Sequence, residues 1–421
     1  METLTINGGM PLYGELNVGG SKNAVLPILA ACILTDEEVV IHNAPDISDI
    51  DDMLYIMSDL GIKSRRENDT LIINCSGMTS YEISDEHVGK IRSSVVLMGA
   101  VIARFHTARL AQPGGCDIGA RPIDIHLSAL RQMGVNITYE DQCWNCSAEK
   151  LSGSNITLPF PSVGATENVI LAASMASGQT IIRNAAKEPE IEALQTFINL
   201  MGGQISGAGT DTVTITGKSK YHACEYTVIP DRIVAGTYML MTCGTGGDVL
   251  IRNALPEHNR ALSECISAMG AYISADGNSI RVRKTRRLNP IEFTQTAPFP
   301  GFPTDLQPQL MAVLTLANGT SVIRENIYEN RFKAAYSLCA LGAQINIQVI
   351  DSQTSLAVIR GVDILKGARI YGTDLRCNAA LIIAGLQAHG TTVLHRAHFI
   401  ERGYENIVNA IKSVGGDITA S

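Results

Sequence analysis

The chain has 421 residues, of which 45% are hydrophobic and 18% charged, and its formal net charge is −8. That length exceeds one ordinary hydrophobic core and predicts two domains. The acidic balance argues against a nucleic-acid partner, so an anionic ligand would have to be held by a local cluster of arginines. No apolar run has transmembrane length and Met1–Gly20 has no signal-sequence pattern, so we expect a cytoplasmic protein with no membrane partner.

An internal repeat organises the chain. A hydrophobic residue followed by glycine recurs six times at intervals of about 70 residues, with the glycine at Gly61, Gly134, Gly202, Gly270, Gly342 and Gly415. A hydrophobic residue leading into a polar turn precedes it in five copies, at Ile41–Ala44, Ile182–Ala185, Ile251–Ala254, Ile323–Asn326 and Leu394–Ala397. Each copy is predicted to be an α/β module with two helices and several short strands, one helix amphipathic and one apolar. Six modules predict two domains of three, with a boundary near Pro230 and Asp231.

The stretch Gln112–Arg121 departs from the repeat, because its loop is longer than the corresponding turns. Its three glycines and one proline exclude a regular helix or strand. Extra length in one copy of a repeat is a common place for function. Cys116 in this loop has Arg109 and Arg121 nearby in sequence, which would stabilise a thiolate or attract an anion. On these residues alone, a reactive thiol and a structural thiol remain open alternatives.

The other cysteines favour a structural role. Most of the ten cysteines lie in apolar contexts, which in a reducing compartment indicates free core thiols. Cys143 and Cys146 form a lone CxxC pattern with no second ligand pair at a matching spacing. We therefore predict no metal site, with adventitious redox or metal chemistry at this pair as the alternative.

Eight motifs in order resemble the enolpyruvyl transferase family, over a span from Ile6 to about Ile418. They are Gly20–Ala24, Pro113–Cys116, Ile118–Pro122, Ser162–Thr166, Phe302–Asp305, Glu329–Phe332, Thr373–Arg376 and Arg402–Glu405. The resemblance is nearest to the members whose acceptor is UDP-N-acetylglucosamine. It implies a two-domain inside-out α/β barrel fold, each domain built of three repeated α/β units. The expected domains are 22–229, carrying the Cys116 loop, and 1–21 plus 230–421.

The resemblance also implies the reaction. The family transfers the enolpyruvyl group of phosphoenolpyruvate to a sugar hydroxyl and releases phosphate, which for this acceptor begins peptidoglycan precursor synthesis. It implies that Cys116 donates a proton to C3 of phosphoenolpyruvate, that Cys116 is open to alkylation by epoxides, and that Asp305 is the candidate base. Lys22 and Arg402 complete the expected catalytic set. No cofactor is expected, and self-association is left open.

Further residues are assigned to substrate binding by the resemblance. Two anionic ligands require a cluster of cations, and planar guanidinium groups suit carboxylates and phosphates. The expected set consists of Lys22, Asn23, Arg92, Arg121, Pro122, Ile123, Asp124, Ile125, Pro161, Ser162, Val163, Gly164, Asp305, Ile327, Arg331, Asp374, Arg376 and Arg402.

Several of these residues have a plainer structural alternative. Ser21 before Lys22 has the residue type of a helix N-cap, although a helix N-terminus with a lysine is also an anion site. Asp305 and Asp374 precede the expected helices Leu306–Ala317 and Leu375–Gln387 and would serve equally as N-caps. Asp231 is a hinge residue or part of the electrostatics of the site.

Three positions depart from the family pattern, at Ser48, Val234 and Gln112, and the first of them removes a positive charge near the expected cleft. Two other functions remain open. The shikimate-pathway relative shares the reaction type, but it lacks the Pro-Gly-Gly-Cys loop. A non-catalytic paralogue that binds nucleotide sugar is suggested by Ser48, whereas the presence of Lys22, Cys116 and Asp305 argues against it.

Overall fold

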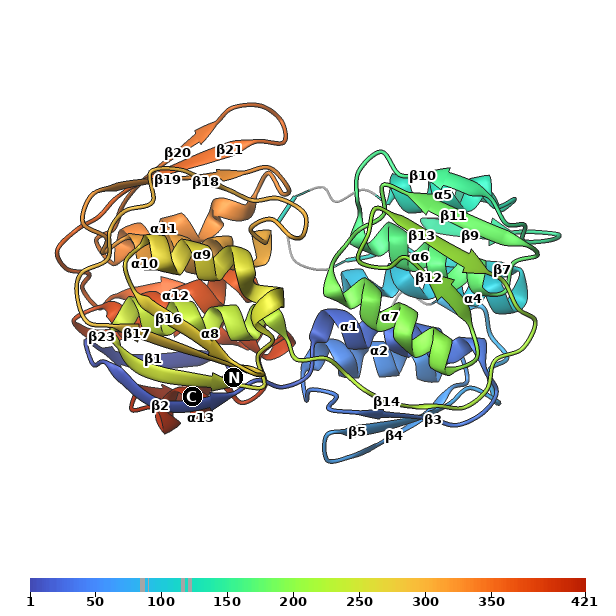
Figure 1. The fold of residues 1–421 in the computed structure, drawn as a ribbon, viewed down its shortest axis with the longest axis horizontal. Coiled ribbons are helices and arrows are strands. Elements are labelled where there is room, and N and C mark those ends of the chain that lie inside the picture. The colour runs from blue at the N-terminus through green and yellow to red at the C-terminus, as the bar shows by residue number, and fades with distance from the viewer. Residues whose placement is uncertain (84–87, 90, 115–117, 120–122) are drawn as a thin grey trace. The chain divides into compact units, whose positions relative to one another are not determined.

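The computed structural model describes residues 1–83, 88–89, 91–114, 118–119 and 123–421. Its contacts divide the chain into two compact units. Unit 1 contains Met1–Gly19 and Pro230–Ser421, together with Ile118 and Gly119, and unit 2 contains the described residues of 20–114 and 123–229. Each unit has its own hydrophobic core, and Figure 1 labels the helices and strands of both units.

Unit 2 has three buried helices, three outer helices and three four-stranded sheets in its described part. The buried helices are α1 (Lys22–Ala31), α4 (Val96–Phe105) and α6 (Val163–Ser174), and the outer ones are α2 (Ser48–Asp59), α5 (Asp124–Gln132) and α7 (Pro189–Leu200), with the 3₁₀ turns η1 (Cys32–Leu34) and η2 (Arg92–Val95). The sheets are β14-β3-β5-β4, β6-β7-β9-β8 and β10-β11-β13-β12. Their strands are β3 (Val39–His42), β4 (Lys63–Glu67), β5 (Thr70–Asn74), β6 (Glu82–Ile83), β7 (Thr107–Ala111), β8 (Asn136–Glu140), β9 (Cys143–Ser147), β10 (Asn155–Thr157), β11 (Gln179–Arg183), β12 (Gln204–Ser206), β13 (Thr212–Thr216) and β14 (Glu225–Thr227).

Unit 1 repeats this plan. Its buried helices are α8 (Arg232–Thr245), α10 (Gln307–Leu314) and α12 (Leu375–Gln387), its outer helices are α9 (Arg260–Ala268), α11 (Ala334–Ala340) and α13 (Ile407–Ser413), and its 3₁₀ turns are η3 (Pro256–Asn259), η4 (Thr304–Leu306), η5 (Arg331–Lys333) and η6 (Ala397–Arg402). The sheets are β22-β23-β1-β24, β16-β17-β15-β2 and β18-β19-β21-β20. Their strands are β1 (Thr3–Gly8), β2 (Leu12–Asn17), β15 (Gly247–Arg252), β16 (Tyr272–Asp276), β17 (Ser279–Lys284), β18 (Thr294–Gln295), β19 (Thr320–Glu325), β20 (Gln344–Val349), β21 (Ser355–Arg360), β22 (Arg369–Tyr371), β23 (Gly390–His395) and β24 (Asp417–Ala420).

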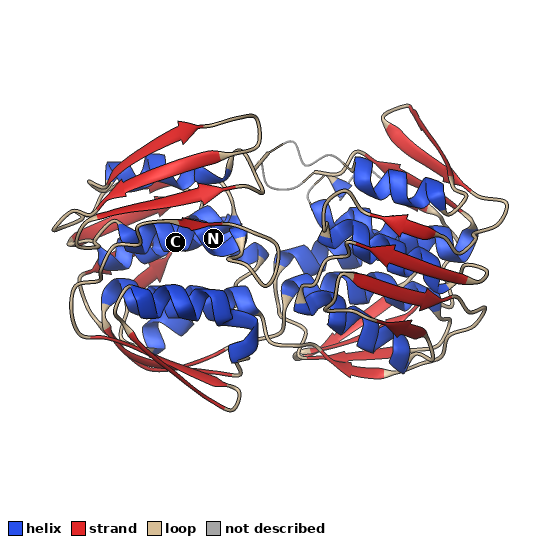
Figure 2. Cartoon of the chain, turned by 45° about the horizontal axis from the view of Figure 1, so that its top comes forward, coloured by secondary structure: helices blue, strands red, loops and turns tan. Residues whose placement is uncertain are grey.

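The buried helices lie in the interior of each unit and the sheets lie on its outside (Figure 2). Every residue of α10 and α12 is buried, and so is all of α1 except Asn23. A helix that is apolar all round is stable only when it is covered on all sides. The strands alternate instead between buried and more accessible positions, as β13 does, because one face of each sheet packs on the helices. The inside-out α/β arrangement predicted from the sequence is therefore present in both units.

The repeated sequence patterns have a backbone cause. The six repeated glycines, at the C-terminal end of each outer helix, all have positive φ between 85° and 100°. In four of the polar turns the residue directly after the strand has positive φ, at Asn43, Asn184, Asn253 and Arg396. Glycine, and to a smaller degree asparagine, adopts this conformation at least cost. The pattern therefore marks where each module must reverse its chain.

Strand pairing and helix bounds define the ends of unit 1 and the segments that carry its site. The strand β1 lies between β23 and β24, and β2 pairs in parallel with β15. The expected helix Leu306–Ala317 is divided into η4 and the shorter α10, whereas α12 spans Leu375–Gln387 as expected.

No helix in the described residues has both the length and the apolar composition needed to cross a membrane.

Candidate active site

Asp305 in unit 1 is held by two buried arginines. Arg331 donates from Nη2 to Asp305 Oδ1 at 2.6 Å. Arg376 donates from Nε and Nη2 to Asp305 Oδ2, at 3.1 and 2.9 Å. The two guanidinium side chains are 3% and 5% exposed, whereas the Asp305 side chain is 27% exposed. A ligand can therefore reach the carboxyl group, but the two cations behind it are shielded.

The environment fixes the charge of Asp305. Burial by itself would raise the pKa of this carboxyl group, but the positive charges of Arg376, Arg331 and Arg232 and the hydrogen bond from Arg376 outweigh burial. They hold the pKa of Asp305 well below its usual range. The group is therefore a carboxylate throughout the neutral range, and it is a weak base as long as both arginines donate to it.

The N-cap alternative is wrong for Asp305 and correct for Asp374. The Asp305 side chain faces the arginines, and the N-cap position of α10 is Leu306, which makes no side-chain cap bond. Asp374 Oδ1 accepts from the backbone amides of Arg376 and Cys377, both at 3.0 Å. Asp231 likewise caps α8 through the amides of Ile233 and Val234, at 2.8 and 2.9 Å.

A buried carboxylate supports the loop that precedes Asp305. Glu325, at the end of β19, is fully buried and accepts from the hydroxyls of Thr296 and Thr304, at 2.7 and 2.9 Å. It also accepts from the backbone amides of Ile327 and Tyr328, at 2.8 and 3.3 Å. One side chain thus ties both the segment before Asp305 and the segment containing Ile327 to β19. The eight motifs gave no sign of it.

The described part of the long loop contacts the segment before Arg331. The amide of Asn330 donates to the carbonyl of Ile118 at 3.2 Å. A Cβ added at Gly119 would lie 2.3 Å from Glu329 Oε2, so the loop backbone approaches this side chain closely. Cys116, Arg121 and Pro122 lie outside the described residues.

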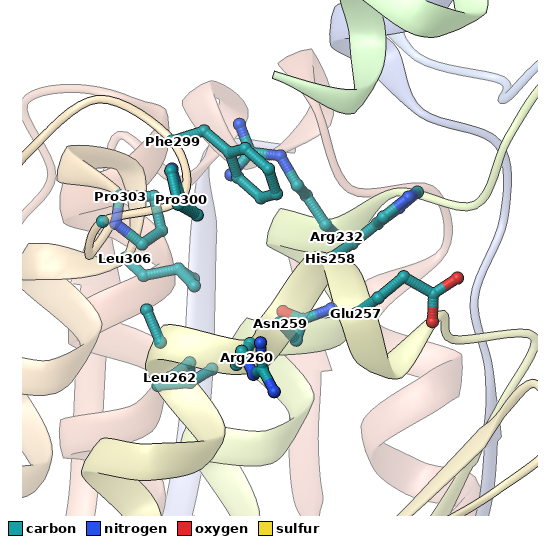
Figure 3. A pocket seen from close by; sticks show the side chains of 12 residues that line it. Arg232, Glu257, His258, Asn259, Arg260, Leu262, Phe299, Pro300, Pro303 and Leu306 are labelled. Atoms are coloured by element: carbon teal, nitrogen blue, oxygen red, sulfur yellow. The ribbon is translucent and has the colours of Figure 1, made fainter. Parts of the chain in front are cut away.

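A cavity of about 200 Å³ lies within unit 1, and its lining includes Pro303 and Leu306, which flank Thr304 and Asp305 in the sequence. Figure 3 shows the side chains of Arg232, Phe299 and Pro303 around it. The Cζ atom of Arg232 is 5.8 Å from the centroid of the Phe299 ring, which lies in the proline-rich loop before Asp305. Arg402, the last residue of η6, is in the same unit.

In unit 2 the structure places Lys22 in the first turn of α1, against Asp49 of α2. The Lys22 Nζ to Asp49 Oδ2 distance is 2.6 Å, and the two side chains are 11% and 5% exposed. Ser21 caps α1 by accepting from the amide of Ala24 at 3.3 Å. The N-cap interpretation of Ser21 is therefore correct, and Lys22 follows the cap as the first residue of the helix. Ser48 is the first residue of α2, next to Asp49. The partially exposed Asn23 follows Lys22 in the same turn.

The other expected binding residues of unit 2 lie at helix starts. Ser162 caps α6 through the amide of Ala165, next to Pro161, Val163 and Gly164. Ile123, Asp124 and Ile125 begin α5, and Arg92 begins η2. Gly164 is required by close packing, because a Cβ there would lie 2.9 Å from His126 Cε1. The buried Asn168 donates to His126 Nδ1 at 2.8 Å and to the carbonyl of Val95 at 3.0 Å, which joins η2, α5 and α6.

Three acidic residues of unit 2 were missed at the sequence level. Glu167 in α6 is buried, and Glu190 and Glu188 lie near it. Burial, and then the charges of Glu190 and Glu188, raise the pKa of Glu167 well above its ordinary value. The available signal was the presence of Glu167 and Asn168 within an otherwise apolar helix.

The structure has no group of three or more His, Cys, Asp or Glu side chains that is arranged to hold a metal ion, as far as the chain is described. Cys143 and Cys146 both lie in β9 and are buried. Burial raises the pKa of Cys146 to about 12, so this thiol is protonated and unreactive at neutral pH.

These sites occur on a fold with known relatives. The family model described as EPSP synthase (3-phosphoshikimate 1-carboxyvinyltransferase) matches residues 6–411, and the chain therefore belongs to this family of enolpyruvyl transferases. The enolpyruvyl transferase NikO from Streptomyces tendae has a TM-score of 0.87 and 25% identity, covering 99% of this chain and 98% of that chain. EPSP synthase from Acinetobacter baumannii, at 17% identity, has a TM-score of 0.75 over all of both chains and shows the same fold.

Curated relatives match at higher identity over their full length. A protein of Caldanaerobacter subterraneus subsp. tengcongensis named UDP-N-acetylglucosamine 1-carboxyvinyltransferase 2 is 47% identical over 418 residues, covering 99% of each chain. A protein of Thermotoga maritima named UDP-N-acetylglucosamine 1-carboxyvinyltransferase is 42% identical, covering 99% of this chain and 98% of its own length. The family predicted from the eight motifs is confirmed.

Proposed function

We propose that this chain transfers the enolpyruvyl group of phosphoenolpyruvate to the 3-hydroxyl of UDP-N-acetylglucosamine and releases phosphate. This is the first committed step of peptidoglycan precursor synthesis, and we place it in the cytoplasm. The structural observation that supports the proposal best is Asp305, a partly exposed carboxylate held by Arg331 and Arg376. A fixed carboxylate of this kind is suited to accept a hydrogen bond from a neutral sugar hydroxyl. The names of the full-length relatives support the same acceptor.

The chemistry takes place in two stages. The oxygen of the 3-hydroxyl attacks C2 of phosphoenolpyruvate, its proton passes to Asp305, and an acid adds a proton to C3, which gives a tetrahedral ketal. In the second stage C3 loses a proton, the C2–O bond to phosphate breaks, and the enol ether forms. Because Asp305 is a weak base in its arginine clamp, it takes the proton late, when the forming C–O bond has made the hydroxyl strongly acidic.

The remaining roles follow from charge and position. Lys22 and Arg402, with Arg92 and Arg121, bind the phosphate and carboxylate groups of the two anionic substrates. Cys116 is the proposed acid for C3. The segments 121–125 and 161–164, together with Ile327, complete the substrate contacts, with Asn23 beside Lys22. The shielded Arg331 and Arg376 act on the substrate through Asp305, which they hold. Asp374 acts there mainly by capping α12, which carries Arg376.

The direct test is phosphate release from phosphoenolpyruvate with each candidate acceptor. We expect release with UDP-N-acetylglucosamine and none above background with shikimate 3-phosphate. Release only with shikimate 3-phosphate would reassign the acceptor. Binding of UDP-N-acetylglucosamine with no release under any condition would support a regulatory paralogue instead.

The role of Cys116 has a test of its own. An acid of another kind can replace a thiol as proton donor, but a poor acid cannot. Cys116→Asp should keep measurable phosphate release and resist alkylation by an epoxide, whereas Cys116→Ser should lose about 10²-fold or more. Mass spectrometry of the epoxide-treated native protein should find the label on Cys116. Native turnover in Cys116→Ser, or a label on another cysteine, would disprove the assignment.

A further inference from the structure

Tyr404 contacts the edge of Arg376 that Asp305 does not use. It follows η6 and is buried, with 3% of its surface exposed. Arg376 Nη1 donates to Tyr404 Oη at 3.3 Å, and Arg376 Cζ lies 5.7 Å from the centroid of the ring. Because Nε and Nη2 of Arg376 both face Asp305, the guanidinium plane is fixed by partners on two sides.

Two further helices contribute to this contact. Thr237 Oγ1 of α8 lies 2.7 Å from Tyr404 Oη. Gln309 Nε2 of α10 donates to Thr237 Oγ1 at 3.2 Å and to Tyr404 Oη at 3.4 Å. The group therefore joins α8, α10 and α12 in the core of unit 1, and both Thr237 and Gln309 are buried polar residues within apolar helices.

The available hydrogens fix the direction of these bonds. Thr237 has one hydroxyl hydrogen and donates it to the carbonyl of Ile233, one turn earlier in α8, at 2.8 Å. Its oxygen is then an acceptor, so the hydroxyl of Tyr404 must donate to Thr237. The lone pairs of the Tyr404 hydroxyl oxygen then accept the hydrogen bonds that Arg376 and Gln309 donate. A chain of bonds with one direction thus runs from Arg376 through Tyr404 and Thr237 to the backbone of α8.

We propose that Tyr404 is a positioning residue for the reaction, and that Thr237 sets the direction of its hydroxyl so that Arg376 is held against Asp305. This rests on the proposed function, because Asp305 acts there on the acceptor hydroxyl. Without the tyrosine hydroxyl, Arg376 can pivot about its contact with Asp305, and the carboxylate loses its fixed position. Catalysis is sensitive to such movement, since a misplacement of about 1 Å costs on the order of 10²-fold in rate.

The experiment compares four variants by kcat and KM for UDP-N-acetylglucosamine per folded enzyme, with the thermal midpoint measured in parallel. Tyr404→Phe and Thr237→Val should each lower kcat by about tenfold or more, the scale of one hydrogen bond to a charged group. The KM should change much less. Thr237→Ser keeps the acceptor oxygen and should retain kcat near the native value. The double variant of Tyr404→Phe and Thr237→Val should be no worse than either alone, because both break the same chain of bonds.

Two matched controls separate positioning from packing. Thr242→Val, also in α8, removes a fully buried hydroxyl that donates only to the carbonyl of Tyr238 in the described structure, and it should lower stability but keep kcat. Tyr272→Phe changes an exposed tyrosine of the same unit and should change neither kcat nor the thermal midpoint. Native kcat in Tyr404→Phe, with only the thermal midpoint lowered, would overturn the proposal. Equal loss in Thr237→Ser and Thr237→Val would show that the methyl group of Thr237 matters and its hydroxyl does not, and would overturn the role of Thr237.

Failure of the proposed function gives a different result. If the native protein releases no phosphate with UDP-N-acetylglucosamine, the proposed function is wrong, whatever the variants do. Crystal structures of the native protein and of Tyr404→Phe then decide the positioning role separately. We expect Arg376 to leave Asp305 in the variant, and an unmoved Arg376 would overturn the inference.

Discussion

At Asp305, burial and two guanidinium groups act on one carboxyl group in opposite directions. Burial alone would favour the neutral acid, but Arg376 and Arg331 favour the carboxylate more strongly. The arginines in turn need Asp305, because an unpaired charge in a buried position costs several kcal/mol. The negative charge that the proposed function requires of Asp305 is therefore the same charge that stabilises the two buried arginines.

Replacing this carboxylate should affect both properties. We expect Asp305→Asn to lower kcat by about 10²-fold or more and to destabilise unit 1 by about 3 to 5 kcal/mol. Because the folded pKa is lowered, the native carboxylate stabilises the fold above its unfolded pKa and loses this effect as the pH falls. The stability difference between variant and native should therefore shrink in acid.

Phosphate release at neutral pH and thermal unfolding between pH 2 and pH 7 check this prediction, because the stabilisation is lost only below the unfolded pKa of about 3.9. Asp363→Asn is the control, because its side chain is 91% exposed and pairs with Arg287 at the surface. An Asp305→Asn variant with native turnover would show that the carboxylate has no part in the reaction.

Gly119 is a second position where one residue decides a local structure. Its φ is 144° and a Cβ would lie 2.3 Å from Glu329 Oε2. Gly119→Ala should weaken the contact between Ile118 and Asn330, raise the rate of proteolytic cleavage near residue 118, and lower phosphate release. Gly277→Ala is the control, because its φ is also positive but nothing lies within 4 Å of its Cβ position. Unchanged cleavage in Gly119→Ala would show that Glu329 moves aside at little cost.

At the scale of elements, α6 carries an acid that its surroundings keep protonated. Because the folded pKa of Glu167 is raised, its stabilising effect is complete below the unfolded pKa, about 4.3, and is lost as the pH rises through the folded pKa. Glu167→Gln should therefore resemble the native protein in mild acid and become the more stable of the two at alkaline pH, by up to about 1.4 kcal/mol per pH unit.

Denaturant unfolding of both proteins from pH 5 to pH 9 measures this difference. The control is Glu140→Gln in β8, which is exposed and should give the same difference at every pH. A stability difference that stays constant from pH 5 to pH 9, as in the control, would mean that the native Glu167 is already ionised and that its pKa is not raised.

At the scale of the whole molecule, the first strand belongs to the core of the last modules. Ile6 in β1 is fully buried in unit 1, between β23 and β24, whereas Ile28 in α1 is fully buried in unit 2. Either change to alanine should cost about 2 to 5 kcal/mol, but in different units. Hydrogen exchange should show lost protection in β23 and α12 for Ile6→Ala and in unit 2 for Ile28→Ala. Loss confined to α1 and α2 in Ile6→Ala would contradict the described pairing of β1.

The sequence by itself determined the α/β class, the six modules, the family and the start of α12. These features depend on local rules, such as glycine at positive φ, apolar helices, and capping aspartates like Asp374, which act over a few residues. Whether Asp305 caps a helix or pairs with arginines was decided only by tertiary structure, because the two alternatives look the same in sequence. Arg331 and Arg376 come from distant segments, and only tertiary packing brings both of them to one carboxylate, with Tyr404 on the far edge of Arg376. A group's charge and orientation depend on such neighbours in space, and sequence distance does not report them.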